Sequence, residues 1–489
     1  MRQLGRQDKS APKNTTVAQF GQGTFLRAFA DYMIDVANEQ GVFDGGVAII
    51  KPRPLGSLES FEKQDSAYTV ILRGLVEGKK SVESRMINAI TQTINPFTEY
   101  DRYLDLAKSA DLRFVISNTT EAGIVFDEAD LFDQKPANSF PGKLTQFLFA
   151  RYTFFAGAPD RGLIIIPTEL IENNGTKLYD CVTKLIALWN LPPEFAAWVT
   201  DTCIFCNTLV DRIVSGYPKD EAETLERDLL GYRDELMVVG EPFALWVIES
   251  PRWKEVQQAF PLDLAGMPLM FTDNLRPYRE RKVRILNGAH TTTVLAAFQA
   301  GLNIVSEAMA DQTIRAFLEK AVYEEIVPTV PLPAEEVRTF ADSVLERFEN
   351  PFIRHALLSI ALNSVSKWKT RILPSLKDSF SATGKLPPCL TFSLAALATF
   401  YRSAEQGNGC LIGRRADETY EIRDDAHVLA FFAEHAPKPT EDFVSALLGN
   451  TAFWGEDLNS LGDMTALVTK HCKAIEEMGI RRAIESVLA

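Results

Sequence analysis

The stretch "KVRILNGAHTTTVLAAF", residues 282–298, is mostly apolar and indicates a buried helix, yet it carries Lys282, Asn287 and His290. On a regular α-helix, Asn287 and His290 lie about 60° apart, and Lys282 lies about 80° from His290. A lysine, an amide and an imidazole at one apolar site suit the interconversion of a carbonyl and an alcohol. A desolvated lysine can exchange a proton near neutral pH, and the other two groups can hydrogen-bond the reacting oxygen. The alternative is structural: a satisfied core histidine, a capping asparagine and a lysine in the solvated cluster "RPYRERK".

A glycine-containing turn follows the first apolar run of the chain. "AQFGQGTFLRAF" leads through two glycines into a segment with helical periodicity. Such glycines let the backbone turn tightly and approach a pyrophosphate. We therefore expect a dinucleotide to contact Phe20, Gly21, Gly23, Phe25, Leu26 and Arg27. Leu26 stands where the common fingerprint has its third glycine, so a plain tight turn remains the alternative.

Two further segments follow buried strands, at the sheet edge where ligands bind in α/β folds. In "SNTTEAG", the polar side chains of Asn118, Thr119, Thr120 and Glu121 could hydrogen-bond a ribose or a nicotinamide; an ordinary polar loop is the competing interpretation. "VAIIKPRP" offers Lys51 and Arg53 instead of the carboxylate that often binds ribose hydroxyls. Cations there favour a 2′-phosphate and hence NADP, unless both are solvated loop residues. From these residues alone, the choice between NAD and NADP stays open.

The elements that must position these residues change along the chain. The first part alternates strands and helices, with continuous apolar runs such as "LRFVIS" and "GLIIIP" and a hairpin turning at Glu77 and Gly78. We expect an α/β, Rossmann-like doubly wound domain over residues 1–280. From residue 281 the apolar residues recur at helical spacing, which predicts a mostly α-helical domain over residues 281–489. Within it, residues 402–425 are expected to form an exposed loop with room for a small hairpin.

The composition narrows the classes of function. The 489 residues carry a formal net charge of -14, which argues against nucleic acid or an anionic membrane as partner. No apolar run approaches the length of a membrane span, and we expect a cytoplasmic protein. The pair of cysteines in "CIFC" has a metal-like spacing, but no second pair or nearby histidine completes a site. We expect no metal.

Several motifs resemble the mannitol dehydrogenase family, and the resemblance covers nearly the entire chain. They are "QFGQGTFLRAF", "SNTTEAGI", "IIIPTELI", "NTLVDRI", "ERKVRILNGAHT", "RF.NP" and "SIALNSVSKWKTRILP". Members are long-chain polyol dehydrogenases that need no zinc. The resemblance implies that Lys282 is the catalytic base, that Asn287 and His290 surround the substrate oxygen, and that the cofactor is NAD(H), despite Lys51 and Arg53.

Two departures from the mannitol enzymes fall on positions that contact substrate. Leu170 stands where they have an asparagine, and Ser359 stands where they have an arginine, eight residues before Lys367. The resemblance therefore implies unchanged chemistry on an altered substrate, and we expect a hexuronate keto acid interconverted with its aldonate. Beside these two positions we expect three residues to bind the substrate: Lys367, Arg371 and Glu169.

A buried carboxylate needs a cation, which favours Lys367 as its main partner and Arg371, four residues on and on the same helix face, as support. A solvated basic face is the alternative. A fructuronate reductase, a hexitol dehydrogenase and a catalytically silent dinucleotide-binding regulator are the rival functions. Substrate stereochemistry, oligomeric state and physiological direction stay open at this point.

Overall fold

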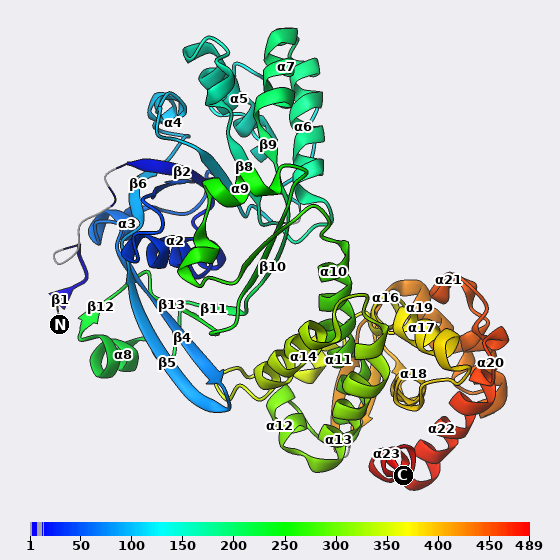
Figure 1. The fold of residues 1–489 in the computed structure, drawn as a ribbon. Helices are drawn as coiled ribbons and strands as arrows, with labels where there is room; N and C mark the ends of the chain where they lie inside the picture. The colour runs from blue at the N-terminus through cyan, green and yellow to red at the C-terminus, as the bar shows by residue number, and fades with distance from the viewer. Residues whose placement is uncertain (1, 7–11, 13, 121, 416) are drawn as a thin grey trace. The chain divides into compact units, whose positions relative to one another are not determined.

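The chain forms two compact units, which we describe separately. The computed structural model describes residues 2–6, 12, 14–120, 122–415 and 417–489 (Figure 1). Unit 1 comprises Met1–Gly74 and Lys80–Leu275, and unit 2 comprises Leu75–Lys79 and Arg276–Ala489. The division therefore falls directly before helix α10 (Arg276–Lys282), a few residues earlier than the sequence pattern placed it.

A six-stranded parallel sheet forms the centre of unit 1 (Figure 1). Its strands, in spatial order, are β6 (Ile90–Ile94), β3 (Gly46–Ile50), β2 (Thr15–Phe20), β7 (Phe114–Ser117), β8 (Ile164–Pro167) and β9 (Ile204–Phe205). All five neighbouring pairs run parallel. The order reverses at β2, as in a doubly wound fold, and this confirms the expected Rossmann-type architecture.

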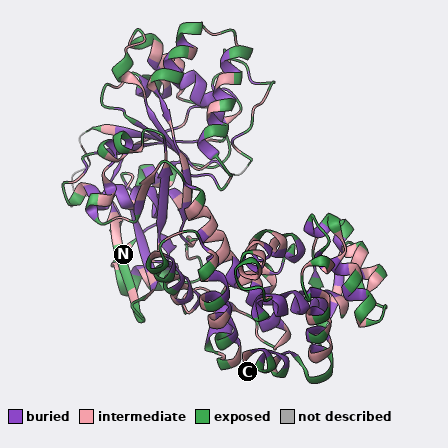
Figure 2. Ribbon diagram, turned by 45° about the vertical axis from the view of Figure 1, so that its right-hand side comes forward, coloured by how far each residue is buried: buried purple, intermediate pink, exposed green. Residues whose placement is uncertain are grey.

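Both faces of this sheet are covered by helices, which explains why its strands read as continuous apolar runs. Val47 and Ile49 of β3 join one core, and Ala48 and Ile50 join the other. Helices α2 (Ala30–Glu39) and α9 (Trp253–Ala259) contribute to the first core. The second core takes side chains from α4 (Tyr100–Ala107), α5 (Phe140–Phe154), α6 (Asn174–Leu188) and α7 (Pro193–Thr202). The buried strands contrast with the exposed outer faces of the helices (Figure 2).

Smaller sheets flank the central one. Strands β4 (Tyr68–Val76) and β5 (Lys79–Ile87) form the predicted hairpin, and its two turn residues, Glu77 and Gly78, both have positive φ. A separate three-stranded sheet orders β10 (Asn207–Asp211), β14 (Leu245–Glu249) and β15 (Leu269–Thr272).

Unit 2 is mostly helical, as expected. Its longer elements after α10 are η4 (Val283–Asn287), α11 (Gly288–Gln299), α12 (Val305–Ala310), α13 (Gln312–Lys320), η5 (Ala321–Ile326), α14 (Ala334–Phe348), α16 (Ser364–Arg371), α17 (Leu373–Thr383), α18 (Pro388–Arg402), α19 (Ala426–His435), α20 (Thr440–Leu448), α22 (Met464–Met478) and α23 (Ile480–Leu488). Every residue from Cys389 to Tyr401 of α18 is buried, and α18 packs on both α11 and α22. The loop expected over residues 402–425 contains three short strands, β16 (Glu405–Gln406), β17 (Leu411–Arg415) and β18 (Glu418–Ile422).

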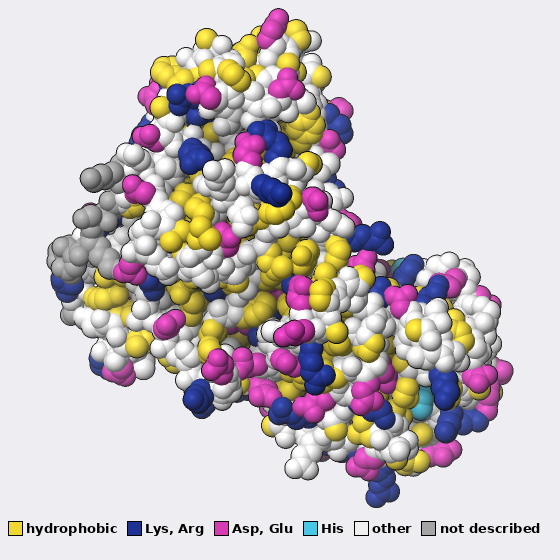
Figure 3. Space-filling model, viewed as in Figure 1, with side chains coloured by type: hydrophobic (Ala, Val, Ile, Leu, Met, Phe, Trp, Pro, Cys, Tyr) yellow, Lys and Arg dark blue, Asp and Glu magenta, His cyan; other side chains and the backbone are white. Residues whose placement is uncertain are grey.

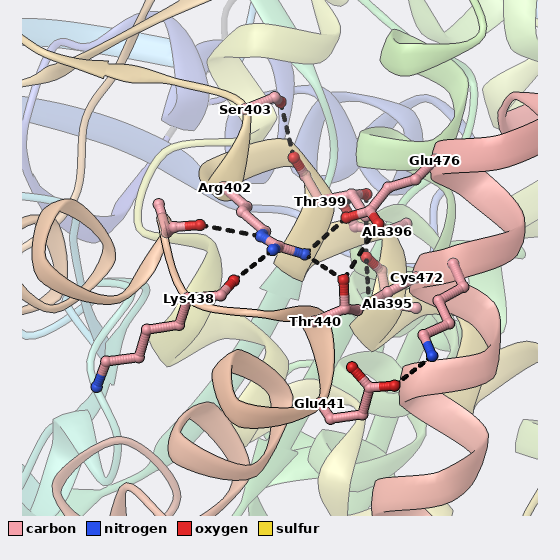
Figure 4. A network of polar contacts seen from close by, with 12 residues as sticks. Ala395, Ala396, Thr399, Arg402, Ser403, Lys438, Thr440, Glu441, Cys472 and Glu476 are labelled. Atoms are coloured by element: carbon pink, nitrogen blue, oxygen red, sulfur yellow. Dashed lines mark hydrogen bonds and ion pairs between the residues drawn. The ribbon is translucent and has the colours of Figure 1, made fainter.

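A polar network at the end of α18 holds three helices together (Figure 4). The guanidinium of Arg402 donates to the backbone oxygens of Ala436 and Lys438, at 3.1 and 2.6 Å. It also donates to the Thr440 hydroxyl at 2.8 Å and to the Glu476 carboxylate at 2.7 Å. One side chain thus links α18 to the start of α20 and to α22.

The surface visible in Figure 3 carries acidic and basic side chains interspersed with one another. Among the described residues, no helix is long and apolar enough to cross a membrane.

Candidate active site

The glycine turn of unit 1 fits a closely approaching ligand. Gly21 has φ +140°, and a Cβ there would lie 3.0 Å from Leu26 Cδ1 and 3.3 Å from the Asn118 oxygen. A side chain at Gly21 would therefore strain the turn. Gly23 is exposed, and within 4 Å of a Cβ placed there the structure describes no atom. The turn is thus tight on its inner side and open on its outer side.

The other predicted residues of this turn direct their side chains into unit 1. Phe20 packs against Phe140 with ring centroids 5.1 Å apart, and Phe25 stacks on Phe29 at 4.8 Å. Leu26 is buried. What these residues present at the turn is therefore their backbone.

Arg27 is also buried, and its guanidinium donates to the Leu236 oxygen. The guanidinium lies 5.3 Å from the centroid of the Tyr68 ring. The Arg27 guanidinium therefore interacts with groups inside unit 1, and burial lowers its pKa. As with its neighbours, any contribution of Arg27 to the turn comes from its backbone.

The buried carboxyl group of Asp31 is linked to the glycine turn through the side chain of Gln19. Gln19 Nε2 donates to the Gly21 oxygen at 3.1 Å and to Asp31 Oδ2 at 3.3 Å. The Tyr68 hydroxyl donates to the same Asp31 oxygen at 2.8 Å. Burial raises the pKa of Asp31 to about 7, against the opposing effect of these two hydrogen bonds. The conformation of Gly21 is therefore linked to a group that titrates near neutral pH.

The loop after β7 is held by Glu169. This buried carboxylate accepts hydrogen bonds from the backbone N–H and hydroxyl of Thr119, at 2.9 and 3.0 Å, and from the Ser117 hydroxyl at 3.0 Å. Asn118 Nδ2 donates to the Thr168 oxygen at 3.0 Å. Glu169, predicted from sequence as a substrate contact, is thus placed by the structure to shape this loop.

Thr120, one residue on, has φ +114°, which is rare for a β-branched residue. Strained backbone of this kind clusters at ligand sites. The predicted Glu121 lies outside the described residues.

The two cations after β3 have different surroundings. Lys51 is buried, and its ammonium donates to the backbone oxygens of Pro54 and Gly56, at 3.0 and 2.5 Å. Arg53 reaches the loop after β7, where Nη2 lies 3.3 Å from the Thr119 oxygen and 3.4 Å from Thr120 Oγ1. Lys51 therefore holds its own loop together, and Arg53 connects the loop after β3 to the loop after β7.

In unit 2, Lys282 and Asn287 are joined by a π turn. The segment between α10 and α11 is a π-helix, η4, and the Gly288 N–H donates to the Val283 oxygen five residues back. The angles expected for an uninterrupted α-helix from Lys282 are therefore wrong across this segment. Residues five apart lie about 140° apart around an α-helix, whereas the wider π turn brings them nearly above one another. Lys282 and Asn287 thus share a face.

His290 lies one α-helical turn further, in a cationic environment. Its ring stacks on Phe348, with centroids 4.0 Å apart, and meets the ring of His355 edge-on at 5.5 Å. Partial burial lowers the pKa of His290 well below its usual value, and four neighbours lower it further: His355, Arg347, Arg371 and Lys367. Its imidazole is therefore neutral at pH 7, so one ring nitrogen donates a hydrogen bond and the other accepts one.

The predicted pair on α16 belongs to this environment. Lys367 donates to the Ile360 oxygen at 2.8 Å, and Arg371 Nη1 lies 3.5 Å from Thr291 Oγ1 on α11. Burial lowers the pKa of both, and for Lys367 the charge of Arg371 adds to this while Asp424 opposes it. The structure thus brings Lys282, Asn287, His290, Lys367 and Arg371 into one unit.

Three neighbours of His290 were not expected from the sequence: Arg347, Phe348 and His355. The first two belong to the motif "RF.NP", whose only signal was its resemblance to a family. Nothing in the spacing of residues 347–355 indicated that the segment returns to His290. Of the two positions that depart from the mannitol enzymes, Leu170 is 64% exposed and Ser359 is also exposed.

The cysteines of "CIFC" are free, buried thiols. Burial raises the pKa of Cys203 to about 11 and that of Cys206 to about 12, so both are protonated at neutral pH. In the part of the chain that the structure describes, no group of three or more histidine, cysteine or acidic side chains is arranged to hold a metal ion.

Comparison with known proteins places both units in one family. Residues 15–261 match the mannitol dehydrogenase Rossmann domain, and residues 274–476 match the mannitol dehydrogenase C-terminal domain. The altronate oxidoreductase of Yersinia enterocolitica is 43% identical over 494 residues, 99% of either chain. Those of Enterobacter sp. strain 638 and Shigella flexneri are 45% identical over 478 residues (96% of either chain) and 44% identical over 492 residues (99% of either chain).

Solved structures agree in fold. The Pseudomonas fluorescens mannitol 2-dehydrogenase, in a ternary complex with NAD and D-mannitol, superposes with a TM-score of 0.66 at 21% identity, covering 99% of both chains. A substrate-free D-sorbitol dehydrogenase superposes with a TM-score of 0.79 at 20% identity, covering 99% of this chain and 100% of that one.

Proposed function

The chain belongs to the mannitol dehydrogenase family and is an oxidoreductase that acts on a CH–OH group, and we propose that it catalyses the reversible NAD(H)-dependent reduction of D-tagaturonate to D-altronate. Three relatives at 43–45% identity over nearly the whole chain carry the name altronate oxidoreductase. The observation that carries the proposal is the grouping of Lys282, Asn287 and His290 with the cations Lys367 and Arg371 in unit 2. The lysine, the amide and the imidazole can exchange a proton or hydrogen bonds with the substrate carbonyl, and the two cations can pair with a substrate carboxylate.

The residues of unit 2 divide the chemistry between them. In reduction, the ammonium of Lys282 gives a proton to the oxygen of the former ketone as the carbon gains a hydride; in oxidation, the neutral amine takes that proton back. Asn287 and the neutral His290 donate hydrogen bonds to this oxygen, which stabilises its developing negative charge. This division of roles needs no metal.

The carboxylate of a keto acid requires compensation in a partly buried site, because an unpaired buried charge costs several kcal/mol. The cations Arg347, Arg371 and Lys367 all act on His290, and their positive charge favours an anion nearby. We assign the carboxylate to Lys367, with Arg371 in support. Glu169 shapes the loop after β7.

Unit 1 fits a dinucleotide. Gly21 and Gly23 would admit the pyrophosphate, and Asn118, Thr119 and Thr120 would meet the ribose or the nicotinamide. When bound, the nicotinamide supplies or accepts the hydride. We propose NAD over NADP. The ammonium of Lys51 donates hydrogen bonds to the backbone oxygens of Pro54 and Gly56, and is therefore not directed at the 2′-phosphate of NADP. Initial rates with NADH and NADPH test this: a higher kcat/KM with NADPH would contradict it.

The proposed function is tested by following NADH absorbance with tagaturonate, fructuronate and fructose side by side. We expect the highest kcat/KM with tagaturonate. A clear preference for fructuronate would make the protein a fructuronate reductase, and a preference for fructose a hexitol dehydrogenase. A protein that binds NADH but turns over none of the three would be a dinucleotide-binding regulator.

A further inference from the structure

Asn287, His290 and His355 present three partly buried polar side chains in unit 2. Among the residues that the structure describes, no hydrogen-bond partner exists for the side chain of Asn287, the ring nitrogens of His290 or those of His355. All three side chains are only partly buried, so their polar atoms are open to a ligand or to water. Asn287 and His290 already have a role in the proposed chemistry, whereas His355 has none.

The position of His355 is fixed by its backbone. Its carbonyl oxygen accepts a hydrogen bond from the Val305 N–H at 3.0 Å, and the next residue, Ala356, forms an isolated antiparallel bridge with Ile304. Its ring lies edge-on to that of His290, with centroids 5.5 Å apart, and it remains partly exposed. A sugar chain with its carbonyl oxygen at His290 brings the hydroxyl groups of the following carbons within reach of His355.

The chemistry of His355 suits a hydroxyl group better than a carboxylate. Burial lowers its pKa, so the imidazole is neutral at pH 7 and offers one donor and one acceptor. A hydroxyl group also donates and accepts, and can therefore pair with either nitrogen. A carboxylate only accepts, and it has Lys367 and Arg371 nearby.

We propose that His355 is a specificity-determining residue that hydrogen-bonds a hydroxyl group of the substrate chain and thereby discriminates between epimers at that carbon. This inference rests on the proposed function and deepens it. Tagaturonate and fructuronate differ in the configuration of a single hydroxyl group, and the neutral ketoses tagatose and fructose differ in the same way. If His355 hydrogen-bonds this hydroxyl group, replacing His355 will change the ratio of activities on the two epimers within each pair.

The test compares kcat/KM for both pairs in the wild type, in His355→Phe and in His355→Gln. His355→Phe keeps a ring beside His290 but removes both hydrogen-bonding atoms, and we expect it to lower the tagaturonate-to-fructuronate ratio about tenfold, the effect of one lost hydrogen bond. His355→Gln restores a donor and an acceptor and should recover part of the ratio. The matched control is His471→Phe, since His471 is a buried histidine whose ring also meets an aromatic ring edge-on, that of Phe392 at 5.3 Å.

Two results would overturn the inference. If His355→Phe lowers activity on both epimers equally, His355 only supports the ring of His290. If the ratio stays at its wild-type value with activity unchanged, His355 lies outside the site. The neutral pair separates this inference from the proposed function: wild type inactive on both keto acids would refute the latter, and the tagatose-to-fructose ratio would still decide the role of His355.

Discussion

Lys282 and Asn287 lie one π turn apart on a single helix, so that two residues which a regular α-helix would place on different sides share a face. The residue after Asn287 is Gly288, and neighbouring atoms lie close to it. A Cβ placed at Gly288 would lie 3.4 Å from the Arg371 backbone oxygen and 3.6 Å from Ile326 Cδ1. The π turn therefore sits where α11 packs closely on the end of α16. The same short segment presents the residues proposed to act on the substrate oxygen and contacts the helix that carries Lys367.

Replacing Lys282 by alanine should abolish most turnover, because the ketone oxygen loses its proton donor. We expect kcat to fall by about 10²–10⁴, the range for general acid–base catalysis, with NADH binding retained in a fluorescence titration. In the wild type, the rate of altronate oxidation should rise with pH as the lysine becomes neutral. Lys254→Ala, an exposed lysine of unit 1, is the control. Near-normal turnover in Lys282→Ala would remove this residue from the mechanism.

Asn287→Ala and His290→Ala should each lower kcat by about 10²–10³, as expected when a donor to a developing oxyanion is lost. Steady-state kinetics with tagaturonate separates kcat from KM. A rise in KM alone, with kcat unchanged, would make these residues ground-state binding groups instead.

Lys367→Met should raise the KM for tagaturonate far more than the KM for fructose, because only the keto acid carries the carboxylate that this ammonium binds. Lys369→Met is the matched control, since Lys369 lies on the same helix but points to another side, near Gly455. Equal losses on the charged and the neutral substrate would show that Lys367 has a structural role, and the carboxylate partner would have to be sought elsewhere.

Asp31 should make the stability of unit 1 depend on pH. Its pKa is raised to about 7 in the folded state, compared with 3.8 as the ordinary value. The folded state therefore keeps a proton that the unfolded state releases, and stability is lost as the pH rises from about 4 through 7. At about 1.36 kcal/mol per pKa unit, the loss is on the order of 4 kcal/mol.

The measurement is the melting temperature of the wild type and of Asp31→Asn, by calorimetry between pH 5 and 9. The wild type should lose stability relative to the variant as the pH rises through 7. Asp105→Asn, at an exposed ion pair with Lys108, should show a constant offset. If Asp31→Asn also shows a constant offset, the carboxyl group does not titrate in this range.

Local chain chemistry accounts for much of what was expected from the sequence. Continuous apolar runs predicted strands covered on both faces, helical periodicity predicted a helical second unit, and the pair Glu77-Gly78 predicted a hairpin turn; the structure contains all three. These features depend on neighbouring residues, since period, turn residues and capping act over a few positions. Lys282, Asn287 and His290 could be singled out from the sequence because they lie within one short apolar segment.

Tertiary structure alone decided the rest. No residue type in "VRILN" indicates the π turn at η4, and this turn changes the angles that a regular helix implied. The approach of His355 to His290 joins residues 65 positions apart in the sequence, which spacing does not encode. Lys51 and Arg53 looked alike as cations after a strand, but the fold buried one ammonium against two backbone oxygens and left the other side chain reaching across to the loop after β7. Which groups face a ligand depends on contacts between distant segments, and these exist only once the chain has folded.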